Sequence, residues 1–337
     1  MIEGHGDDLY QFKGNIKYNF SSNVYYKGCS PLLMQNLAQN LNQIQHYPSP
    51  AASELNTLAA QYFNLEENNF LFTNGAVEAF YLIAQYYSGK SATIVGPTFA
   101  EYEDACKINK VRYNFISWNQ IENKYTADLV FICNPNNPSG SVLKIEALKR
   151  LLKAHPSTRF VVDEAYNEFT NTVKSALSLT KKYKNLTVVR SLTKTFAMPG
   201  LRLGYMVSES NFIDKIVALK MPWSVNSLAI ASGEFIFSNY KKMSFDISTL
   251  LKEVDIFKQA VNAIDYLEVV EGETTYFLVE LTKNKKAAAL KKYLVEEHQL
   301  LIRDATNFTG LTGEFIRLSV QTELANVTLI NALKEWE

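Results

Sequence analysis

The feature that most constrains this chain is a series of short apolar runs, each of which ends in polar or turn-forming residues. They span residues 70–76, 92–99, 129–140, 160–166 and 186–194. Short runs rich in β-branched and aromatic residues are typical of strands buried on both faces of a parallel sheet. Patterns typical of helices lie between them, for example over 77–87 and 144–154. This alternation predicts an α/β fold with a mostly parallel sheet.

The polar ends of these runs are predicted to meet. Right-handed crossovers place the carboxyl ends of parallel strands on one edge of a sheet, and open α/β sheets bind their ligands at that edge. The residues expected there are Asn74, Gly75, Phe99, Asn137, Asp163, Tyr166, Ser191 and Lys194. The sequence therefore predicts a ligand site that several loops build together.

The pattern changes after about residue 235, where helical and strand-like segments alternate as in a smaller α+β unit. Helices are predicted over 249–264 and 285–299, and strands over 267–272, 276–281 and 315–320. The first 40 residues have no apolar pattern of their own, so we expect them to pack on this unit. We thus predict an N-terminal segment (1–40), a large domain (41–235) and a small domain (236–337) built from both termini.

Composition excludes several classes of partner. The 337 residues include 34 Lys or Arg and 34 Asp or Glu, which gives a formal net charge of zero. Without a basic excess, neither nucleic acid nor an anionic membrane is an expected partner. The 3 cysteines and 4 histidines are widely spaced, which predicts no disulfide framework and no metal site. The sequence shows no signal-like start and no long apolar run, so we expect a cytoplasmic protein.

Single residues at the predicted edge have ordinary explanations. Gly75 opens a helix whose free amides can hold a phosphate, but most such turns bind nothing. Asp163 ends a buried strand and could be a salt-bridge partner or a helix cap, and Lys194 could be a solvated cation. Their combination is more specific, because lysine binds carbonyl cofactors covalently and a buried acid pairs with a pyridinium nitrogen. A phosphate cradle, an acid, an aromatic ring and a lysine together indicate a site for pyridoxal phosphate.

Three stretches carry a resemblance to a known family: NPNNPSG (134–140), DEAY (163–166) and SLTKTFAMPGLRLGY (191–205). In order and spacing, over nearly the whole chain, they resemble the class I/II aminotransferases, which are pyridoxal phosphate enzymes of fold type I. The resemblance implies that Lys194 binds the cofactor aldehyde and later moves a proton. It implies that Asp163 and Tyr166 contact the ring nitrogen and the phenolic oxygen, that Asn137 joins Tyr166, and that Phe99 stacks on the ring.

The same resemblance implies where the cofactor phosphate binds. The implied set is Gly75, Ala76, Val77, Ser191 and Arg202. The glycines and proline around Arg202 then serve to bring the backbone close to the phosphate. Tyr47, in HYPSP (46–50), matches a tyrosine that reaches the phosphate of the neighbouring subunit, which implies a homodimer with shared sites. Arg317, in FIRLSV (315–320), matches an arginine that holds a substrate carboxylate.

The chain resembles two groups within the family, which catalyse different reactions. HYPSP, NPNNPSG and DEAY also resemble histidinol-phosphate aminotransferases. NFSSNVY (19–25), GPTFAEYE (96–103), PWSVN (222–226) and LIRDATNFTGL (301–311) resemble more closely the threonine-phosphate decarboxylases of the cobalamin pathway. Thr193 and Pro199 also differ from the serine and the alanine that are expected at these positions in histidinol-phosphate aminotransferases. We therefore expect a decarboxylase first and a transaminase second.

Both groups act on small phosphorylated amino compounds, which directs attention to two further residues. Asn23, in NFSSNVY, is predicted to contact the substrate. Arg303, in LIRDATNFTGL, is predicted to hold the substrate phosphate, with a surface or interdomain salt bridge as the alternative. Asp7 departs from the decarboxylase pattern, since a glycine commonly stands at its position.

Overall fold

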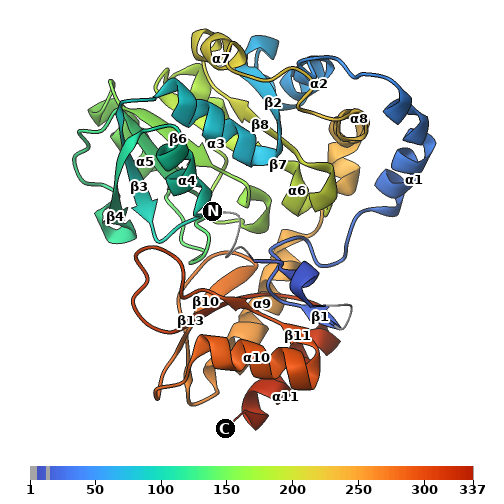
Figure 1. The fold of residues 1–337 in the computed structure, drawn as a ribbon, viewed down its shortest axis with the longest axis vertical. Coiled ribbons are helices and arrows are strands. Elements are labelled where there is room, and N and C mark those ends of the chain that lie inside the picture. The colour runs from blue at the N-terminus through green and yellow to red at the C-terminus, as the bar shows by residue number, and fades with distance from the viewer. Residues whose placement is uncertain (1–5, 13–15, 337) are drawn as a thin grey trace.

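A computed structural model describes residues 6–12 and 16–336, which form a large and a small domain (Figure 1). The strands of the large domain are β2 (Phe70–Asn74), β3 (Ser91–Gly96), β4 (Arg112–Ser117), β5 (Leu129–Cys133), β6 (Arg159–Asp163), β7 (Leu186–Ser191) and β8 (Leu203–Val207). They form one sheet in the order β2-β8-β7-β6-β5-β3-β4. Every pairing is parallel except those of β8, which runs antiparallel to β2 and β7. The predicted α/β class with a mostly parallel sheet is confirmed.

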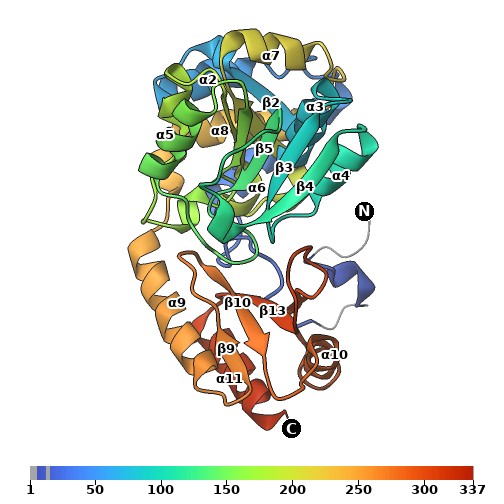
Figure 2. The same cartoon turned by 90° about the vertical axis from the view of Figure 1, so that its left-hand side faces the viewer.

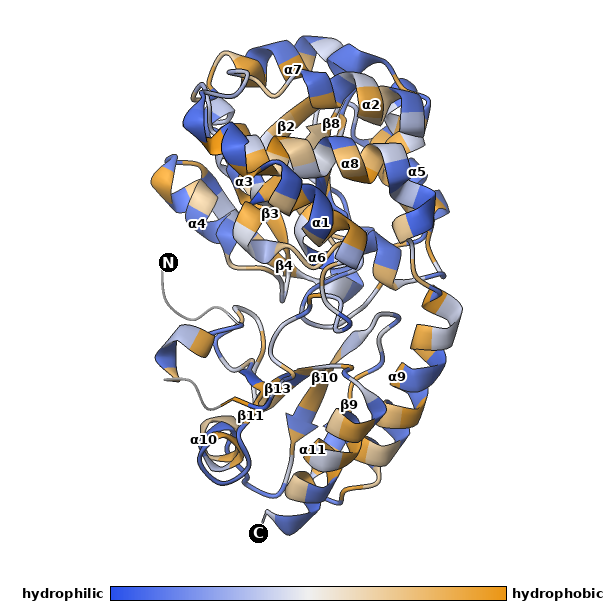
Figure 3. Cartoon of the chain, turned by 90° about the vertical axis from the view of Figure 1, so that its right-hand side faces the viewer, coloured by the Kyte–Doolittle hydropathy of each residue, from blue (hydrophilic) through white to orange (hydrophobic). Residues whose placement is uncertain are grey.

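Helices cover both faces of this sheet (Figure 2). They are α1 (Pro31–Gln39), α2 (Glu54–Phe63), α3 (Gly75–Tyr86), α4 (Glu101–Ile108), α5 (Ile145–Ala154), α6 (Leu192–Thr195), α7 (Ser210–Val217) and α8 (Ser227–Met243). Successive side chains of a strand pack into the cores on opposite faces of the sheet. In β2, Phe72 packs with α2 and α8, whereas Leu71 packs with α3. This burial on both faces explains why the strands read as continuous apolar runs. In Figure 3 the central strands are mostly orange, whereas the covering helices carry both colours.

The small domain is an antiparallel sheet covered by helices. Its elements are α9 (Ile247–Asn262), β9 (Leu267–Val269), β10 (Tyr276–Leu281), α10 (Ala287–His298), β11 (Leu300–Leu301), β12 (Arg303–Asp304), β13 (Phe315–Ser319) and α11 (Glu323–Glu335). The sheet order is β12-β13-β10-β9. The helices and strands expected after residue 235 are all present.

The predicted domain boundaries differ from the packing at two places. β1 (Tyr18–Asn19) pairs with β11, and Phe20 lies in the small-domain core, as expected for the N-terminal segment. In contrast, Leu33 of α1 is fully buried in the large-domain core, where α1 packs on α8. The boundary expected at 235 falls inside α8, because this helix continues to Met243.

Two strands of the large sheet did not stand out in the sequence. β4 is an edge strand with a mixed burial pattern, so its apolar signal is weak. β8 lies within the conspicuous SLTKTFAMPGLRLGY stretch and its continuation, where the turn residues dominate the pattern. Its antiparallel direction returns the chain to β2, beside the start of α3.

Candidate active site

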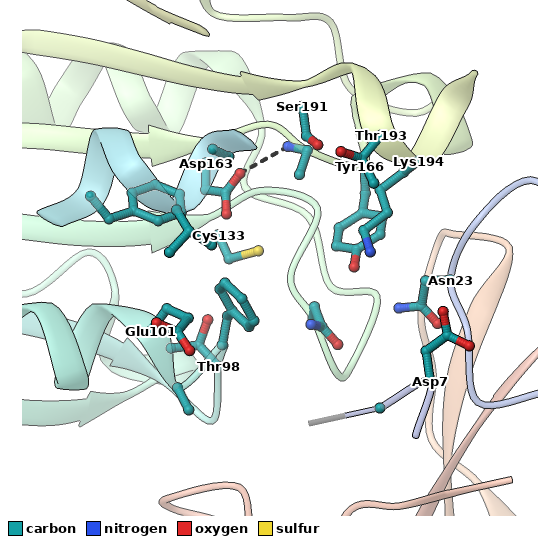
Figure 4. A pocket seen from close by; sticks show the side chains of 18 of the residues that line it. Asp7, Asn23, Thr98, Glu101, Cys133, Asp163, Tyr166, Ser191, Thr193 and Lys194 are labelled. Carbon is teal, nitrogen blue, oxygen red and sulfur yellow. Dashed lines mark hydrogen bonds between the residues drawn. The ribbon is translucent and has the colours of Figure 1, made fainter. Parts of the chain in front are cut away.

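A cavity of about 750 Å³ lies at the carboxyl ends of the parallel strands, and residues of both domains line it. Figure 4 shows side chains from the two domains pointing into it. Of the residues predicted for the site, the cavity is lined by Asn23, Asn74, Ala76, Val77, Phe99, Asn137, Asp163, Tyr166, Ser191, Lys194, Arg202, Arg303 and Arg317. Two predicted residues, Gly75 and Tyr47, are not among the described lining residues.

Gly75 lies against Arg202 at the start of α3. It has a φ of +70°, and a Cβ atom there would lie 2.5 Å from Nη2 of Arg202. A Cβ on Gly204, in β8, would lie 2.5 Å from the backbone nitrogen of Ala76. Both glycines thus allow backbone and guanidinium to approach where a side chain would not fit. The N-terminus of α3 thus lies beside the Arg202 guanidinium, and Ser191 lines the same cavity. This combination of free amides, a cation and a hydroxyl suits a phosphate.

Asp163 ends β6 and is 4% exposed. Its Oδ1 accepts a hydrogen bond from the Ala165 backbone (2.9 Å) and its Oδ2 accepts one from the Tyr102 hydroxyl (2.5 Å). Burial raises the pKa of Asp163 to about 6, against the lowering effect of these hydrogen bonds. This carboxylate is poised to pair with a cationic group of a ligand.

Lys194 belongs to α6, a single helical turn that follows β7 directly. Burial, together with the charges of Arg317 and Arg202, lowers the pKa of Lys194 to about 8. Asp7 and Asp163 oppose the shift. A substantial fraction of a lysine with this pKa is neutral near pH 8, and the neutral amine is the form that attacks a carbonyl.

Arg317, a predicted substrate-binding residue, contacts the predicted cofactor-binding residue Asn137. It lies in β13, is 5% exposed, and donates to Oδ1 of Asn137 (2.5 Å) and to the Ser21 carbonyl (2.6 Å). Its Nε has no hydrogen-bond partner among the described residues. Tyr166 is also buried, and this burial raises its pKa to about 12, so its phenol is neutral.

Arg303 is the cross-strand neighbour of Arg317 in the β12–β13 pair. It is 7% exposed and donates to Oδ1 of Asn307 (2.7 Å) and to the Asp304 carbonyl. Burial and the charge of Arg317 lower the pKa of Arg303 to about 10, which leaves it charged at neutral pH. Two buried guanidinium groups side by side repel each other and favour an anionic ligand.

Asn23 and Thr193 carry buried polar atoms ready for a ligand. Asn23 is 3% exposed, and neither its Oδ1 nor its Nδ2 has a hydrogen-bond partner among the described residues. The same holds for Oγ1 of Thr193, next to Lys194. Because unpartnered buried polar atoms are costly, these atoms point to a polar ligand in the cavity.

Asp7 also lines the cavity. The sequence analysis predicted no role for it and noted only that the decarboxylases commonly have a glycine at this position. Its φ of +63° lies in the region that favours glycine, which agrees with the glycine expected there. Its carboxylate accepts hydrogen bonds from Asn19 (2.5 Å) and Ser22 (3.3 Å). Figure 4 shows it beside Asn23.

Tyr102 is a site residue that the sequence reasoning missed. It is fully buried behind Asp163 and bonded to it, as described above. It stands three positions after Phe99, on the first turn of α4, and this helical spacing was the one available signal.

Tyr47 lies outside the cavity of its own chain. It is 85% exposed and packs against the ring of Trp223, with 5.3 Å between ring centroids. Its predicted contact with a neighbouring subunit stays a prediction.

The residues present fit pyridoxal phosphate. The helix N-terminus with Ser191 and Arg202 suits the phosphate, Asp163 the ring nitrogen, Phe99 the ring face and Lys194 the aldehyde. Within the part of the chain that the structure describes, no group of three or more His, Cys, Asp or Glu side chains could hold a metal ion. No described helix is both long and apolar enough to cross a membrane.

Comparison with known proteins agrees with this geometry. Residues 15–333 match the family model described as aminotransferase class I and II. The crystal structure of L-threonine-O-3-phosphate decarboxylase from Porphyromonas gingivalis is 39% identical, with a TM-score of 0.91 over 94% of this chain and 98% of that one. That of the histidinol-phosphate aminotransferase from Clostridium acetobutylicum is 28% identical, with a TM-score of 0.86 over 94% and 97%. The histidinol-phosphate aminotransferase of Thermoanaerobacter sp. (strain X514) is 32% identical over 87% of this chain and 85% of its own.

Proposed function

Because the chain belongs to the aminotransferase class I and II family, whose members are enzymes that depend on pyridoxal 5′-phosphate, we propose that it is an L-threonine-O-3-phosphate decarboxylase. The second candidate is transamination of histidinol phosphate, since relatives of both kinds are similar to the chain over most of its length. The two reactions share the cofactor and differ in the substrate and in the bond that is broken.

The observation that carries the proposal is the pair of buried arginines at the small-domain side of the cavity. Arg303 and Arg317 are cross-strand neighbours, both less than a tenth exposed, and both line the cavity. Two guanidinium groups match a ligand with two anionic groups. Threonine phosphate has a carboxylate and a phosphate, whereas histidinol phosphate has only a phosphate.

Each of the following residues would have a separate role in the reaction. When bound, pyridoxal phosphate supplies an electron sink for cleavage at the substrate Cα. Asp163 would hold the ring nitrogen, and Lys194 would bind the aldehyde and then move a proton at Cα. Arg317 orients the substrate carboxylate while Arg303 binds the phosphate. The orientation in which Arg317 holds that carboxylate would decide whether carbon dioxide or a proton leaves.

The deciding experiment supplies each phosphorylated substrate with and without 2-oxoglutarate, and measures carbon dioxide and glutamate. We expect carbon dioxide from threonine phosphate without any keto acid. Glutamate from histidinol phosphate, with threonine phosphate unchanged, would replace the decarboxylase by the transaminase. In either case the cofactor and Lys194 keep their roles.

We also propose that the enzyme is a homodimer whose sites are shared through Tyr47. Exposed apolar side chains lie on α1, on the following 3-10 turn and on the loop before α8, whose Trp223 contacts the Tyr47 ring: Leu32, Met34, Leu41, Ile44, Met221 and Trp223. Exposed apolar groups of this kind are typical of a protein interface. We propose that a second copy of the chain covers this surface and that the exposed Tyr47 reaches its cavity.

A further inference from the structure

Asp163 is held from behind by a side chain that does not line the cavity. The hydroxyl of Tyr102, in α4, donates to Oδ2 of Asp163, at the end of β6, over 2.5 Å. Tyr102 is 0% exposed, and it is not among the described residues that line the cavity. Tyr102 therefore acts on a ligand through the lining residues that it contacts, and Asp163 is the one that accepts its hydrogen bond.

The ring of Tyr102 is fixed by aromatic neighbours from other elements. It stacks on Phe131 of β5, with 5.2 Å between centroids and 4° between planes. Phe80 of α3 and Phe99 meet it edge to face, at 4.9 and 5.8 Å. A ring enclosed in this way keeps its hydroxyl in one direction, so the hydrogen bond orients the carboxylate.

Charged neighbours act on Asp163 in opposite directions. The pKa of Asp163 is raised to about 6, mainly by burial and to a smaller extent by the charge of Glu164. The Tyr102 hydrogen bond lowers it, as do the Ala165 amide and the charge of Lys194. Without the Tyr102 bond, more of Asp163 would be protonated near neutral pH.

Three further titratable groups near Asp163 are neutral at pH 7: Cys133, Tyr166 and Tyr102. Burial raises the pKa of the Cys133 thiol, at the end of β5, and that of Tyr166. Burial also raises the pKa of Tyr102 itself well above its ordinary value. Tyr102 therefore stays protonated and acts as the donor of the bond.

We propose that Tyr102 is a positioning residue that keeps the Asp163 carboxylate ionised and directed at the ring nitrogen of the cofactor, a role that rests on the cofactor site of the proposed function. An ionised carboxylate can pair with a protonated ring nitrogen, which a neutral carboxyl group does much less well. The role is independent of whether a decarboxylation or a transamination follows.

The test compares two cofactors on the apoprotein. The Tyr102→Phe variant removes one oxygen and keeps the ring contacts, and circular dichroism checks its fold. Equilibrium dialysis then measures the affinity for pyridoxal phosphate, and for its carbocyclic analogue in which carbon replaces the ring nitrogen, as a function of pH. We expect on the order of tenfold weaker binding of pyridoxal phosphate near pH 7, and unchanged binding of the analogue. The pH midpoint for pyridoxal phosphate binding should also move upward.

A matched control is Tyr125→Phe. Tyr125 is also buried, and its hydroxyl donates to the Ile121 carbonyl over 2.6 Å. Neither residue is among the described residues that line the cavity, so loss of this bond should change neither affinity. Equal weakening of both cofactors in Tyr102→Phe would mean that Tyr102 only packs, and would overturn its role. A wild-type protein that binds both cofactors equally would instead overturn the contact between Asp163 and the ring nitrogen.

An Asp163→Asn background gives a second measurement. If Tyr102 acts through the Asp163 charge, Tyr102→Phe should have little further effect on pyridoxal phosphate affinity in this background. An undiminished effect there would show that Tyr102 acts by another route.

Discussion

Lys194 illustrates how burial prepares a residue for its chemistry. Its pKa is lowered to about 8, mainly by burial and then by Arg317 and Arg202. In the unfolded chain a lysine has a pKa near ~10.4, so the folded apoprotein releases this proton first. By itself, this group makes the folded state more stable as pH rises from about 8 towards ~10.4.

We predict that apoprotein binds pyridoxal phosphate covalently at a rate that rises with pH through about 8, because only neutral Lys194 attacks the aldehyde. Stopped-flow absorbance of the lysine-bound cofactor measures this rate. Lys194→Ala should show no such absorbance at any pH. A wild-type rate independent of pH between 6 and about 10 would contradict the lowered pKa.

Arg303 is predicted to act on the substrate phosphate. Arg303→Ala should raise KM for the phosphorylated substrate by roughly 10-fold to 150-fold, since a hydrogen bond to a charged group contributes about 1.5 to 3 kcal/mol. The KM for the dephosphorylated analogue should change much less. Steady-state kinetics with both compounds provide the comparison, and equal changes would remove Arg303 from the phosphate site.

At the scale of elements, the close contact of β8 with the start of α3 builds the phosphate cradle. Gly204 makes this contact possible, because a Cβ there would lie 2.5 Å from the Ala76 nitrogen and 2.9 Å from the Arg190 carbonyl. All of the nearest atoms belong to backbone, which cannot rotate away as a side chain can. The two elements must therefore separate if Gly204 is replaced.

We predict that Gly204→Ala lowers the free energy of unfolding by about 1 to 3 kcal/mol and weakens cofactor binding. Gly200 is the matched control, since a Cβ there has no neighbour within 4 Å among the described residues. Gly200→Ala should change stability by less than about 0.5 kcal/mol. Urea unfolding and cofactor titration measure both effects, and similar results for the two variants would argue against the close contact.

At the scale of the whole molecule, the exposed apolar surface on α1, the following 3-10 turn and the loop before α8 is predicted to be the dimer interface. Ile44 is 68% exposed within it, while Ile256, on α9 of the small domain, is 69% exposed outside it. Ile44→Asp should shift the protein towards monomer because it places a charge in the interface. Ile256→Asp should leave the dimer intact.

Sedimentation velocity compares these two variants with the wild type. Tyr47→Phe should remain dimeric but lose cofactor more readily, because the hydroxyl that is predicted to reach the neighbouring phosphate is absent. A wild-type protein that is monomeric and fully active would overturn the shared site.

The sequence by itself determined the sheet class and the strand ends at which the cavity lies. Strands buried on both faces must be apolar throughout, and the carboxyl ends of parallel strands meet at one edge. Residues such as Asp163 and Lys194 directly follow or end such strands, so their meeting needed no knowledge of side-chain packing. Their roles toward a cofactor came from the family resemblance of the motifs.

Only the tertiary structure decided the contacts between residues that are distant in the chain. The Tyr102–Asp163 hydrogen bond joins side chains 61 positions apart and depends on how α4 packs over the sheet. The pairing of Arg303 with Arg317 depends on the register of β12 and β13, which a shift of one residue would abolish. The burial of α1 against α8 likewise depends on a surface that the large domain supplies. Such contacts are properties of register and packing, which a local sequence pattern does not encode.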